Sequence, residues 1–407
     1  MQKEALALHR SNKGKLETVP KVKIHSEKDL SLAYSPGVAE PCKEIYSRSE
    51  NVYEYTMKGN TVAIVSDGTA VLGLGNIGPE AAIPVMEGKA VLFKSFAGID
   101  AFPICLDTSD VDKIVETIKL LTPSFGGINL EDISAPRCFQ IEERLKNEMD
   151  IPVFHDDQHG TAVVTLAGLL NALRLTNRTI SGTKIVINGA GAAGIAIFKL
   201  LHSYGFRKII VCDSKGAIYE GRPYGMNPMK NEVARLSNRE LKSGTLQDII
   251  EGADVFIGVS KGGVLTKEMV VRMAEDPVIF AMANPVPEIM PETALDAGSR
   301  VVGTGRSDYP NQVNNVLAFP GIFRGALAVR ATEINDQMKH AAVEAIANII
   351  SDDELAPDYI IPKPLNPEVA PRVAEAVAKA AMKSGVARIH TDPVQVYEQT
   401  KQLATIK

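Results

Sequence analysis

The sequence predicts an α/β fold in which a doubly wound parallel sheet follows an N-terminal α/β domain and precedes C-terminal helices. Between about residues 183 and 304, short β-rich runs alternate with helical segments, which is the pattern of a parallel sheet with helices on both faces. Short strand-like runs also occur, mixed with helices, before residue 158, and the chain beyond about residue 320 is chiefly helical and rich in alanine. We therefore expect three parts, over residues 1–158, 159–325 and 326–407.

The composition favours a globular protein that acts on small molecules. The 407 residues are 45% hydrophobic and 23% charged, and the formal net charge is −5. Such a chain can bury a sizeable core but offers no broad basic field to nucleic acid or to an anionic membrane. Neither nucleic acid nor a membrane is expected as a partner.

The cellular location is predicted from targeting signals and cysteines. The N-terminus carries charges throughout and lacks the apolar core of a signal peptide, and no uncharged apolar run reaches the roughly 18 residues of a membrane span. The four cysteines form no C-x-x-C pair, which argues against a zinc site and a disulfide framework. A cytoplasmic protein with reduced thiols is expected.

In the first domain, "TVAIVSD" and "AFPICLD" are expected strands, and "DVDKIVETIKLL" has the apolar spacing of a helix. Residues 73–78, "GLGNIG", have the glycine spacing of a dinucleotide-binding turn. However, Pro79 and Pro84 bracket at most one or two helical turns, and no acidic residue follows at the required distance. We predict a tight loop that admits another backbone or the substrate.

A second glycine-rich segment, "GAGAAG" at residues 189–194, has the context that the first lacks. The β-rich run "TKIVIN" precedes it, a helical pattern follows it, and "KIIVCD" ends in Asp213 about 20 residues further on. Together these are the parts of a βαβ unit, so residues 159–325 are predicted to form a Rossmann-like NAD(P)-binding domain. The backbone expected to hold the pyrophosphate comprises Gly189, Gly191, Ala192, Ala193 and Gly194.

The choice between NAD and NADP stays open in the sequence. Asp213 can bond the adenosine ribose and would repel a 2′-phosphate. Ser214, Lys215 and Arg222 follow closely and could bind that phosphate. Both cofactors are therefore expected candidates.

Two acidic clusters in the first domain are candidate metal ligands. Glu131 and Asp132 lie in "NLEDIS", and Asp156 and Asp157 lie in "IPVFHDDQHG". Carboxylates supply the hard oxygen ligands that Mg²⁺ or Mn²⁺ prefers. Acidic pairs are also common as solvated loop residues or helix caps. The apolar run before Asp156 indicates a strand end, where sites form in α/β domains.

Other side chains could carry proton transfer or ligate a metal. Lys89, if partly buried, could have its pKa lowered enough to act as a base, although most lysines are solvated. Tyr34 precedes a Ser-Pro-Gly turn that could direct its hydroxyl towards a cleft, although such tyrosines often only bridge core and solvent. His155 and His159 could ligate a metal from a helix, but Gly160 makes a continuous helix doubtful.

Three asparagines late in the chain are candidates for substrate binding, because an amide both donates and accepts. Turn formation is the alternative for each of them. They are Asn284 in "FAMANPVPE", which is also a candidate for contact with the cofactor, and Asn314 and Asn315 in "YPNQVNNVLAFPG".

These motifs together resemble the malic enzymes, in particular the short bacterial form. The resemblance covers nearly the whole chain, through "LAYSPGVAEPC", "DGTAVLGLGNIGP", "EGKAVLFKSFAGIDAFPI", "GGINLEDI", "IPVFHDDQHGTAVV", "GAGAAG", "FAMANPVPE" and "NQVNNVLAFPGIFRGAL". It implies that residues 1–158 are the catalytic domain. It assigns Glu131, Asp132 and Asp157 to a divalent metal, Tyr34, Lys89 and Asp156 to acid/base catalysis, and Asn284 and Asn315 to the substrate.

The resemblance implies oxidative decarboxylation of L-malate through oxaloacetate to pyruvate and CO2, with NAD or NADP and Mn²⁺ or Mg²⁺. It also implies a homodimer, with a site that partner subunits could complete. One position departs from longer members of the family, which have an arginine for a substrate carboxylate where this chain has Ala70. Another group must bind that carboxylate.

Two other functions remain open from the sequence. A metal-dependent oxaloacetate decarboxylase would use the same metal and lysine without a redox step, but the intact "GAGAAG" and Asp213 argue against it. A nucleotide-sensing protein without catalysis would leave the acidic clusters and Lys89 unexplained.

Overall fold

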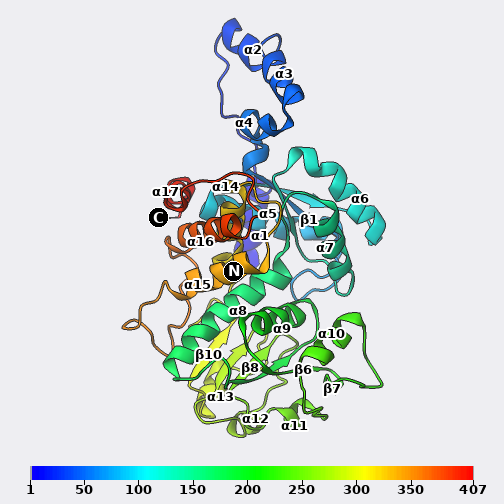
Figure 1. Cartoon of the computed structure of the whole chain (residues 1–407), viewed down its shortest axis with the longest axis vertical. Coiled ribbons are helices and arrows are strands. Elements are labelled where there is room, and N and C mark those ends of the chain that lie inside the picture. The colour runs from blue at the N-terminus through cyan, green and yellow to red at the C-terminus, as the bar shows by residue number, and fades with distance from the viewer. Residues whose placement is uncertain (1, 407) are drawn as a thin grey trace.

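The computed structural model describes residues 2–406, which contain two sheets joined by long helices (Figure 1). The first sheet has the order β2-β1-β3-β4 and is parallel throughout. Its strands are β1 (Thr61–Ser66), β2 (Asp100–Cys105), β3 (Gly127–Leu130) and β4 (Val153–His155). The short "GINL" of β3 was not among the expected strands.

Helices cover both faces of the first sheet, because the side chains of its strands alternate. On β1, Val62 and Ile64 face a core shared with α5 (Pro79–Ala97), whereas Ala63 and Val65 face α6 (Val111–Leu121) and α7 (Arg137–Glu148). The expectation of at most two helical turns after Pro79 is wrong. Helix α5 runs for 19 residues through Pro84, since burial of its apolar face outweighs one lost backbone hydrogen bond.

The second sheet has the order β10-β9-β8-β5-β6-β7. Five of its strands are parallel, and only the short edge strand β7 is antiparallel to β6. This is the predicted doubly wound arrangement. The strands are β5 (Lys184–Asn188), β6 (Lys208–Asp213), β7 (Gly216–Ala217), β8 (Val255–Gly258), β9 (Val278–Ala281) and β10 (Val301–Thr304).

The helices of the second sheet also divide between its faces. On β5, Ile185 and Ile187 face the large core with α8 (Asp156–Leu175) and α9 (Ala192–Tyr204), while Val186 faces a separate core. The other helices of this part are α10 (Pro228–Leu236), α11 (Leu246–Ile249), α12 (Lys267–Val271) and α13 (Pro291–Asp296). Helix α8 begins directly after β4 of the first sheet, so residue 158 lies within its first turn.

The C-terminal helices share the large core with both sheets. Phe319 and Phe323 pack edge-on against Phe93 of α5, with ring centroids 4.7 and 5.3 Å apart. These helices are α14 (Phe319–Ala328), α15 (Asp336–Ala347), α16 (Val369–Lys383) and α17 (Pro393–Leu403), and the 3-10 turn η4 (Asn315–Leu317) precedes them. No helix among the described residues combines the length and apolar character needed to cross a bilayer.

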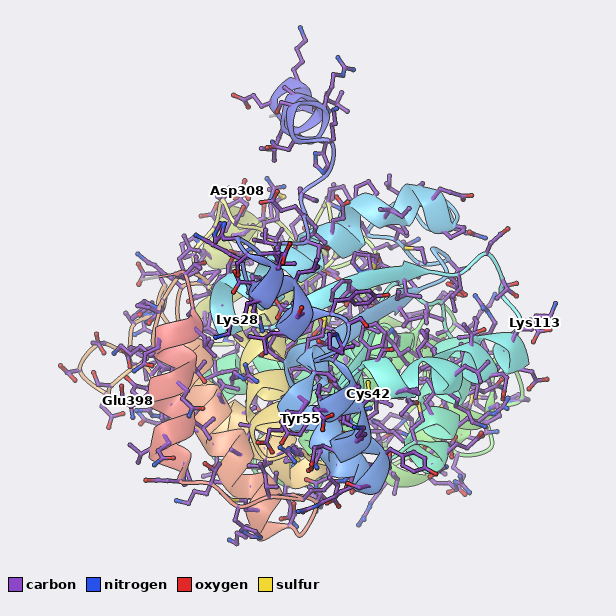
Figure 2. All side chains as sticks on the ribbon, turned by 90° about the horizontal axis from the view of Figure 1, so that it is seen from above. Lys28, Cys42, Tyr55, Lys113, Asp308 and Glu398 are labelled. Atoms are coloured by element: carbon purple, nitrogen blue, oxygen red, sulfur yellow. The ribbon has the colours of Figure 1, made fainter. Side chains whose placement is uncertain are left out.

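The N-terminal residues extend away from this body. Helix α1 (Gln2–Asn12) stands apart in Figure 2, while α2 (Glu27–Ala33), α3 (Ala39–Ser47) and α4 (Val52–Tyr55) project beyond the first sheet in Figure 1. No residue from 2 to 57 is buried. We call residues 16–57 the N-terminal arm. Its exposed large apolar side chains are Leu16, Val19, Val22, Ile24, Leu30, Leu32, Tyr34, Val38, Tyr46, Tyr55 and Met57.

Candidate active site

The acidic residues meet at the carboxyl edge of the first sheet. Leu130 at the end of β3 pairs with His155 at the end of β4, so the residues that follow the two strands leave the sheet side by side. Glu131 and Asp132 follow β3, while Asp156 and Asp157 open α8. Parallel strands thus bring together two clusters that are 25 residues apart in the chain, as between Asp132 and Asp157.

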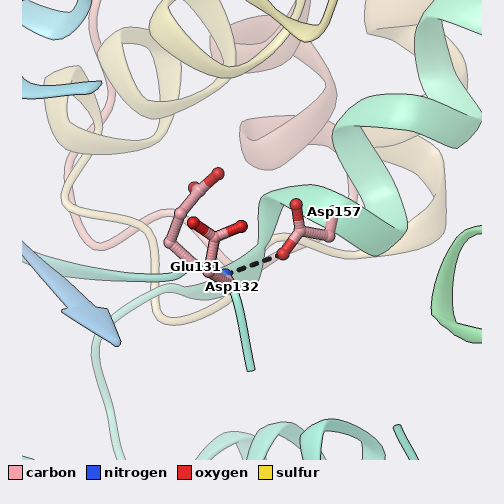
Figure 3. Close-up of side chains that lie close together, drawn as sticks. All are labelled: Glu131, Asp132 and Asp157. Carbon is pink, nitrogen blue, oxygen red and sulfur yellow. Dashed lines mark hydrogen bonds between the residues drawn. The ribbon is translucent and has the colours of Figure 1, made fainter. Parts of the chain in front are cut away.

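Three of these carboxylates form a compact cluster (Figure 3). Glu131, Asp132 and Asp157 each offer one oxygen, and these oxygens all lie within 4.8 Å of one another. The backbone of Asp132 is left-handed, with φ of 56°, a conformation that aspartate tolerates better than most residues. It is held from both sides, because its amide donates to Asp157 Oδ2 at 2.8 Å and its carbonyl accepts from the Ala70 amide at 2.9 Å.

The cluster has the chemistry of a divalent-cation site. Oδ2 of Asp132 is buried and has no hydrogen-bond partner among the described residues. Burial and the neighbouring charge of Asp157 raise the pKa of Asp132 to about 7. Burial also raises the pKa of Glu131 well above its usual value, although the charge of Lys89 opposes that rise. Oxygen ligands that repel one another when ionised are stabilised by a hard cation, so these residues fit Mg²⁺ or Mn²⁺.

Lys89, Asp156 and Asn315 form a second group beside the cluster. Lys89 Nζ, on α5, lies 2.6 Å from Asp156 Oδ2 and 2.9 Å from Glu131 Oε1, and 4.4 Å from the centre of the Phe319 ring. The Asn315 amide donates to the same Asp156 oxygen at 2.8 Å. Asp156 therefore joins the first sheet to a segment 159 residues later.

The expected lowering of the Lys89 pKa is wrong. Burial alone would lower it, but the charges of Asp156 and Glu131 outweigh burial and raise the pKa. The sequence could not give the sign of this shift, because it depends on which carboxylates fold against the lysine.

Neither histidine belongs to the three-carboxylate cluster. His155 Nε2 lies 3.1 Å from Asp157 Oδ2, and His159 Nε2 lies 2.7 Å from Glu142 Oε1. The doubt about a continuous helix at Gly160 was misplaced, since α8 runs through it. The glycine is needed for another reason: an added Cβ would lie 1.8 Å from Asp156 Oδ1, which folds back over this position.

Tyr34 lies outside this group of residues. It is the C-cap residue of α2 in the N-terminal arm, and the residue is 69% exposed. Its hydroxyl is therefore not directed into a cleft of its own chain, contrary to the expectation from the Ser-Pro-Gly turn. The turn does follow it, but the arm carries both away from the first sheet (Figure 1).

The asparagines differ in their surroundings. Asn315 bonds Asp156, as described above, whereas the side-chain oxygen of Asn314 caps η4 by accepting from the Val316 amide at 3.0 Å. Turn formation thus accounts for Asn314. Asn284 follows β9 and is exposed, and its carbonyl oxygen would lie 3.1 Å from a Cβ at Gly73.

That contact shows what the first glycine-rich segment does. Gly73 of "GLGNIG" packs against the backbone of Asn284 and the ring of Pro285, so a side chain there would strain the approach. The predicted tight loop that admits another backbone therefore exists, and it links the edges of the two sheets. The exposed side chains on either side of this link include Leu72, Leu74 and Val286.

The second glycine-rich segment has the geometry of a dinucleotide-binding turn between β5 and α9. Gly189 has φ of 128°, and a Cβ at Gly194 would lie 1.8 Å from the Gly189 carbonyl oxygen. Nothing lies within 4 Å of a Cβ position at Gly191, which leaves that backbone open to a ligand. With Ala192 and Ala193 at the start of α9, the turn fits a pyrophosphate at a helix N-terminus.

Asp213 ends β6 as predicted, but its charge is already paired. Arg222 donates to both of its oxygens, at 2.9 and 2.6 Å, and Lys230 donates at 2.6 Å. These charged hydrogen bonds outweigh burial and lower the pKa of Asp213 to about 2. The Arg222 side chain is fully buried, so it is not free for a phosphate as the sequence suggested. Ser214 and Lys215 remain exposed.

Sequence reasoning missed several polar residues behind the carboxylates. Asn129 donates to Glu131 Oε2 at 2.8 Å, and Gln158 lies between His155 and Glu142. All are buried. A polar residue inside an otherwise apolar strand, as Asn129 is in "GINL", is the signal that could have identified one of them.

Metal binding should stabilise the fold measurably. Saturating Mn²⁺ is expected to raise the Tm by a few degrees, because a ligand at about 100 times its Kd adds about 2.7 kcal/mol of stability. Asp157→Asn should abolish the shift, whereas Glu398→Gln, which removes an exposed carboxylate of α17, should keep it. Differential scanning calorimetry with Mn²⁺ or EDTA measures this. An unchanged Tm for the unmodified protein would contradict the metal site.

Comparison with known proteins places the chain in a family. Residues 13–146 match the family model described as "Malic enzyme, N-terminal domain", and residues 158–382 match "Malic enzyme, NAD binding domain". The chain is 70% identical over 406 residues to the "Bifunctional malic/malolactic enzyme" of Bacillus subtilis (strain 168), covering 100% of this chain and 99% of the relative. It is 59% identical to the "NAD-dependent malic enzyme" of Geobacillus stearothermophilus, covering 94% and 80%.

A solved structure agrees with both sheets and their arrangement. The malic enzyme from Pyrococcus horikoshii Ot3 superposes with a TM-score of 0.96 at 50% identity, covering 99% of this chain and 95% of that one. The relatives include NADP-dependent enzymes as well, such as that of Rhizobium meliloti (strain 1021), which is 53% identical over 97% of this chain and 54% of its own length. The chain described here belongs to the malic enzyme family.

Proposed function

We propose that this chain catalyses the metal-dependent oxidative decarboxylation of L-malate to pyruvate and CO2, with reduction of NAD or NADP. One observation carries the proposal. Lys89 and Asn315 both bond Asp156 Oδ2, beside the carboxylate cluster, and so a proton-transfer group, a metal site and the segment before the C-terminal helices meet at one place. An oxaloacetate decarboxylase without a redox step is not favoured, because that enzyme would not need the intact dinucleotide turn.

Glu131, Asp132 and Asp157 would hold the metal. When bound, the cation supplies Lewis acidity to the substrate oxygens and a positive charge that favours the neutral form of Lys89. Lys89, held by Asp156, would accept the proton of the C2 hydroxyl, and NAD or NADP, when bound, would supply the hydride acceptor for the oxidation of C2. The resulting oxaloacetate loses its distal carboxylate as CO2. Tyr34 then delivers a proton to C3, which gives pyruvate.

Asn284 and Asn315 are proposed to hold the substrate, and the turn at residues 189–194 to hold the pyrophosphate of the cofactor. One amide proton of Asn315 is already donated to Asp156, which leaves its second amide proton and its side-chain oxygen for the substrate. Asn284 stands at the carboxyl end of β9, beside the first glycine-rich loop, where it can contact both substrate and nicotinamide.

We infer that Tyr34 acts in a homodimer, on the site of the partner subunit. The N-terminal arm exposes many large apolar side chains, and none of its residues is buried. Leu72 and Leu74, beside the site, are themselves 71% and 69% exposed. A second copy that laid its arm over this rim would cover both apolar surfaces and bring its Tyr34 close to Lys89.

A cytoplasmic location is supported by the four free cysteines.

The test is nicotinamide reduction with L-malate and Mn²⁺, run with NAD and with NADP, each with and without EDTA. We expect EDTA-sensitive reduction with an equal amount of pyruvate. Lactate is assayed as well, since the name of the Bacillus subtilis relative includes a malolactic activity. Pyruvate release from oxaloacetate without any nicotinamide reduction from malate would overturn the proposal in favour of the lyase.

A further inference from the structure

A buried chain of polar side chains lies behind Asp157. The Gln158 amide nitrogen is 3.1 Å from Glu142 Oε2 and 2.7 Å from His155 Nδ1, and His155 Nε2 is 3.1 Å from Asp157 Oδ2. The His155 side chain is completely buried, and Glu142 and Gln158 are about as well covered, at 5% and 4% exposed. Gln158 of α8 and Glu142 of α7 thus lie behind His155, at the end of β4, and His155 contacts the Asp157 carboxylate.

The direction of each hydrogen bond follows from Glu142. Lys146 Nζ lies 2.7 Å from its Oε1, as expected for an ionised carboxylate, which can only accept. The Gln158 amide must therefore present its NH2 group, and the same group donates to His155 Nδ1. The remaining imidazole proton is then on Nε2, which donates to Asp157 Oδ2.

The two oxygens of Asp157 consequently have different roles. Oδ2 accepts from His155 and also from the Asp132 amide at 2.8 Å, so both of its lone pairs are used. No described residue donates to Oδ1, and Figure 3 shows this second oxygen directed away from the Asp132 bond. Oδ1 is the atom left for a metal.

We propose that His155 is a positioning residue for the metal site: oriented by Gln158 and Glu142, it holds Asp157 Oδ2 so that Oδ1 is presented to the cation. Groups behind a ligand commonly fix its orientation, and losing them typically weakens metal binding about 10- to 100-fold. The inference rests on the metal site of the proposed function. It adds a residue that lies outside the ligand cluster.

The chain offers a matched control in His159. It is also a largely buried histidine, in the first turns of α8, and it bonds Glu142 at 2.7 Å but makes no hydrogen bond to Asp157. His155→Leu and His159→Leu each remove one imidazole that is linked to Glu142 through the same network. Only His155→Leu removes a hydrogen-bond donor to the proposed metal ligand Asp157.

The experiment is calorimetric titration of metal-free protein with Mn²⁺, without substrate. We expect His155→Leu to weaken Mn²⁺ binding about 10- to 100-fold and His159→Leu to leave it near the unmodified value. His155→Gln should recover most of the affinity, because its amide nitrogen can reach the position of Nε2. In assays, the Mn²⁺ concentration for half-maximal activity should rise for His155→Leu, while kcat at saturating Mn²⁺ changes less.

Several results would overturn this role. One is that His155→Leu binds Mn²⁺ as tightly as the unmodified protein does. Another is that His159→Leu loses as much Mn²⁺ affinity as His155→Leu. If His155→Leu does not fold, Gln158→Met tests the same series of hydrogen bonds. A Gln158→Met variant that binds Mn²⁺ as tightly as the unmodified protein would contradict the orientation of His155 by Gln158. Unmodified protein that binds no Mn²⁺ would instead refute the metal site of the proposed function, which separates the two failures.

Discussion

Lys89→Ala should lower kcat for malate oxidation by about two orders of magnitude or more, the usual range for a proton-transfer group. Lys89 Nζ lies 2.6 Å from Asp156 Oδ2, and only 11% of its side chain is exposed, so water cannot readily replace it. Steady-state rates at saturating malate, Mn²⁺ and cofactor measure the effect. Lys94→Ala is the matched control, because Lys94 is on the same helix but is 55% exposed and pairs with Asp100.

Loss of activity in Lys89→Ala could also come from leaving Asp156 and Glu131 without a cation. Lys89→Arg separates the two causes, since arginine keeps the positive charge but does not give up its proton. If Lys89 transfers a proton, Lys89→Arg should be about as inactive as Lys89→Ala. Near-normal turnover in either variant would contradict the proposed role.

Tyr34→Phe should lower kcat by a similar factor, about two orders of magnitude, and the loss should be repaired by a partner chain. In a heterodimer of Tyr34→Phe with Lys89→Ala, one site combines an intact Lys89 with an intact tyrosine from the other chain. The second site has neither. Such a heterodimer, purified through two different affinity tags, should show about half of the activity of the unmodified dimer.

The same heterodimer distinguishes the alternatives sharply. If Tyr34 acts within its own chain, both sites carry one defect and the heterodimer is nearly inactive. Tyr46→Phe serves as the control, since Tyr46 lies on the same arm and is 95% exposed. It should keep full activity alone. Full activity of Tyr34→Phe would remove this tyrosine from the mechanism altogether.

Much of the fold could be predicted from local sequence patterns. The strands around the second glycine-rich turn, and Asp213 at the end of β6, follow from β-rich runs and from a motif whose three glycines have separate steric roles. Helix lengths were less predictable. Helices α5 and α8 continue through Pro84 and Gly160 because buried packing outweighs the local cost of each residue.

The electrostatics of the site could be determined only from the tertiary structure. The sequence identified Lys89, Asp156 and the three carboxylates as candidates, but it did not place Asn315 on Asp156, 159 residues away. It also predicted the wrong direction for the pKa of Lys89, because that direction is the difference between burial and two nearby charges. Side-chain type is local information, whereas the field at a side chain depends on residues from the whole chain.

By itself, the sequence determined the α/β class, the dinucleotide turn and the types of side chain available for chemistry, since periodicity and glycine spacing act over short stretches. Only the tertiary structure decided which oxygens remain free for a metal, that Arg222 is committed to Asp213, and that Tyr34 lies on an exposed arm. These outcomes depend on which parallel strands are neighbours and on where the chain leaves its core, and neither is encoded in any short segment.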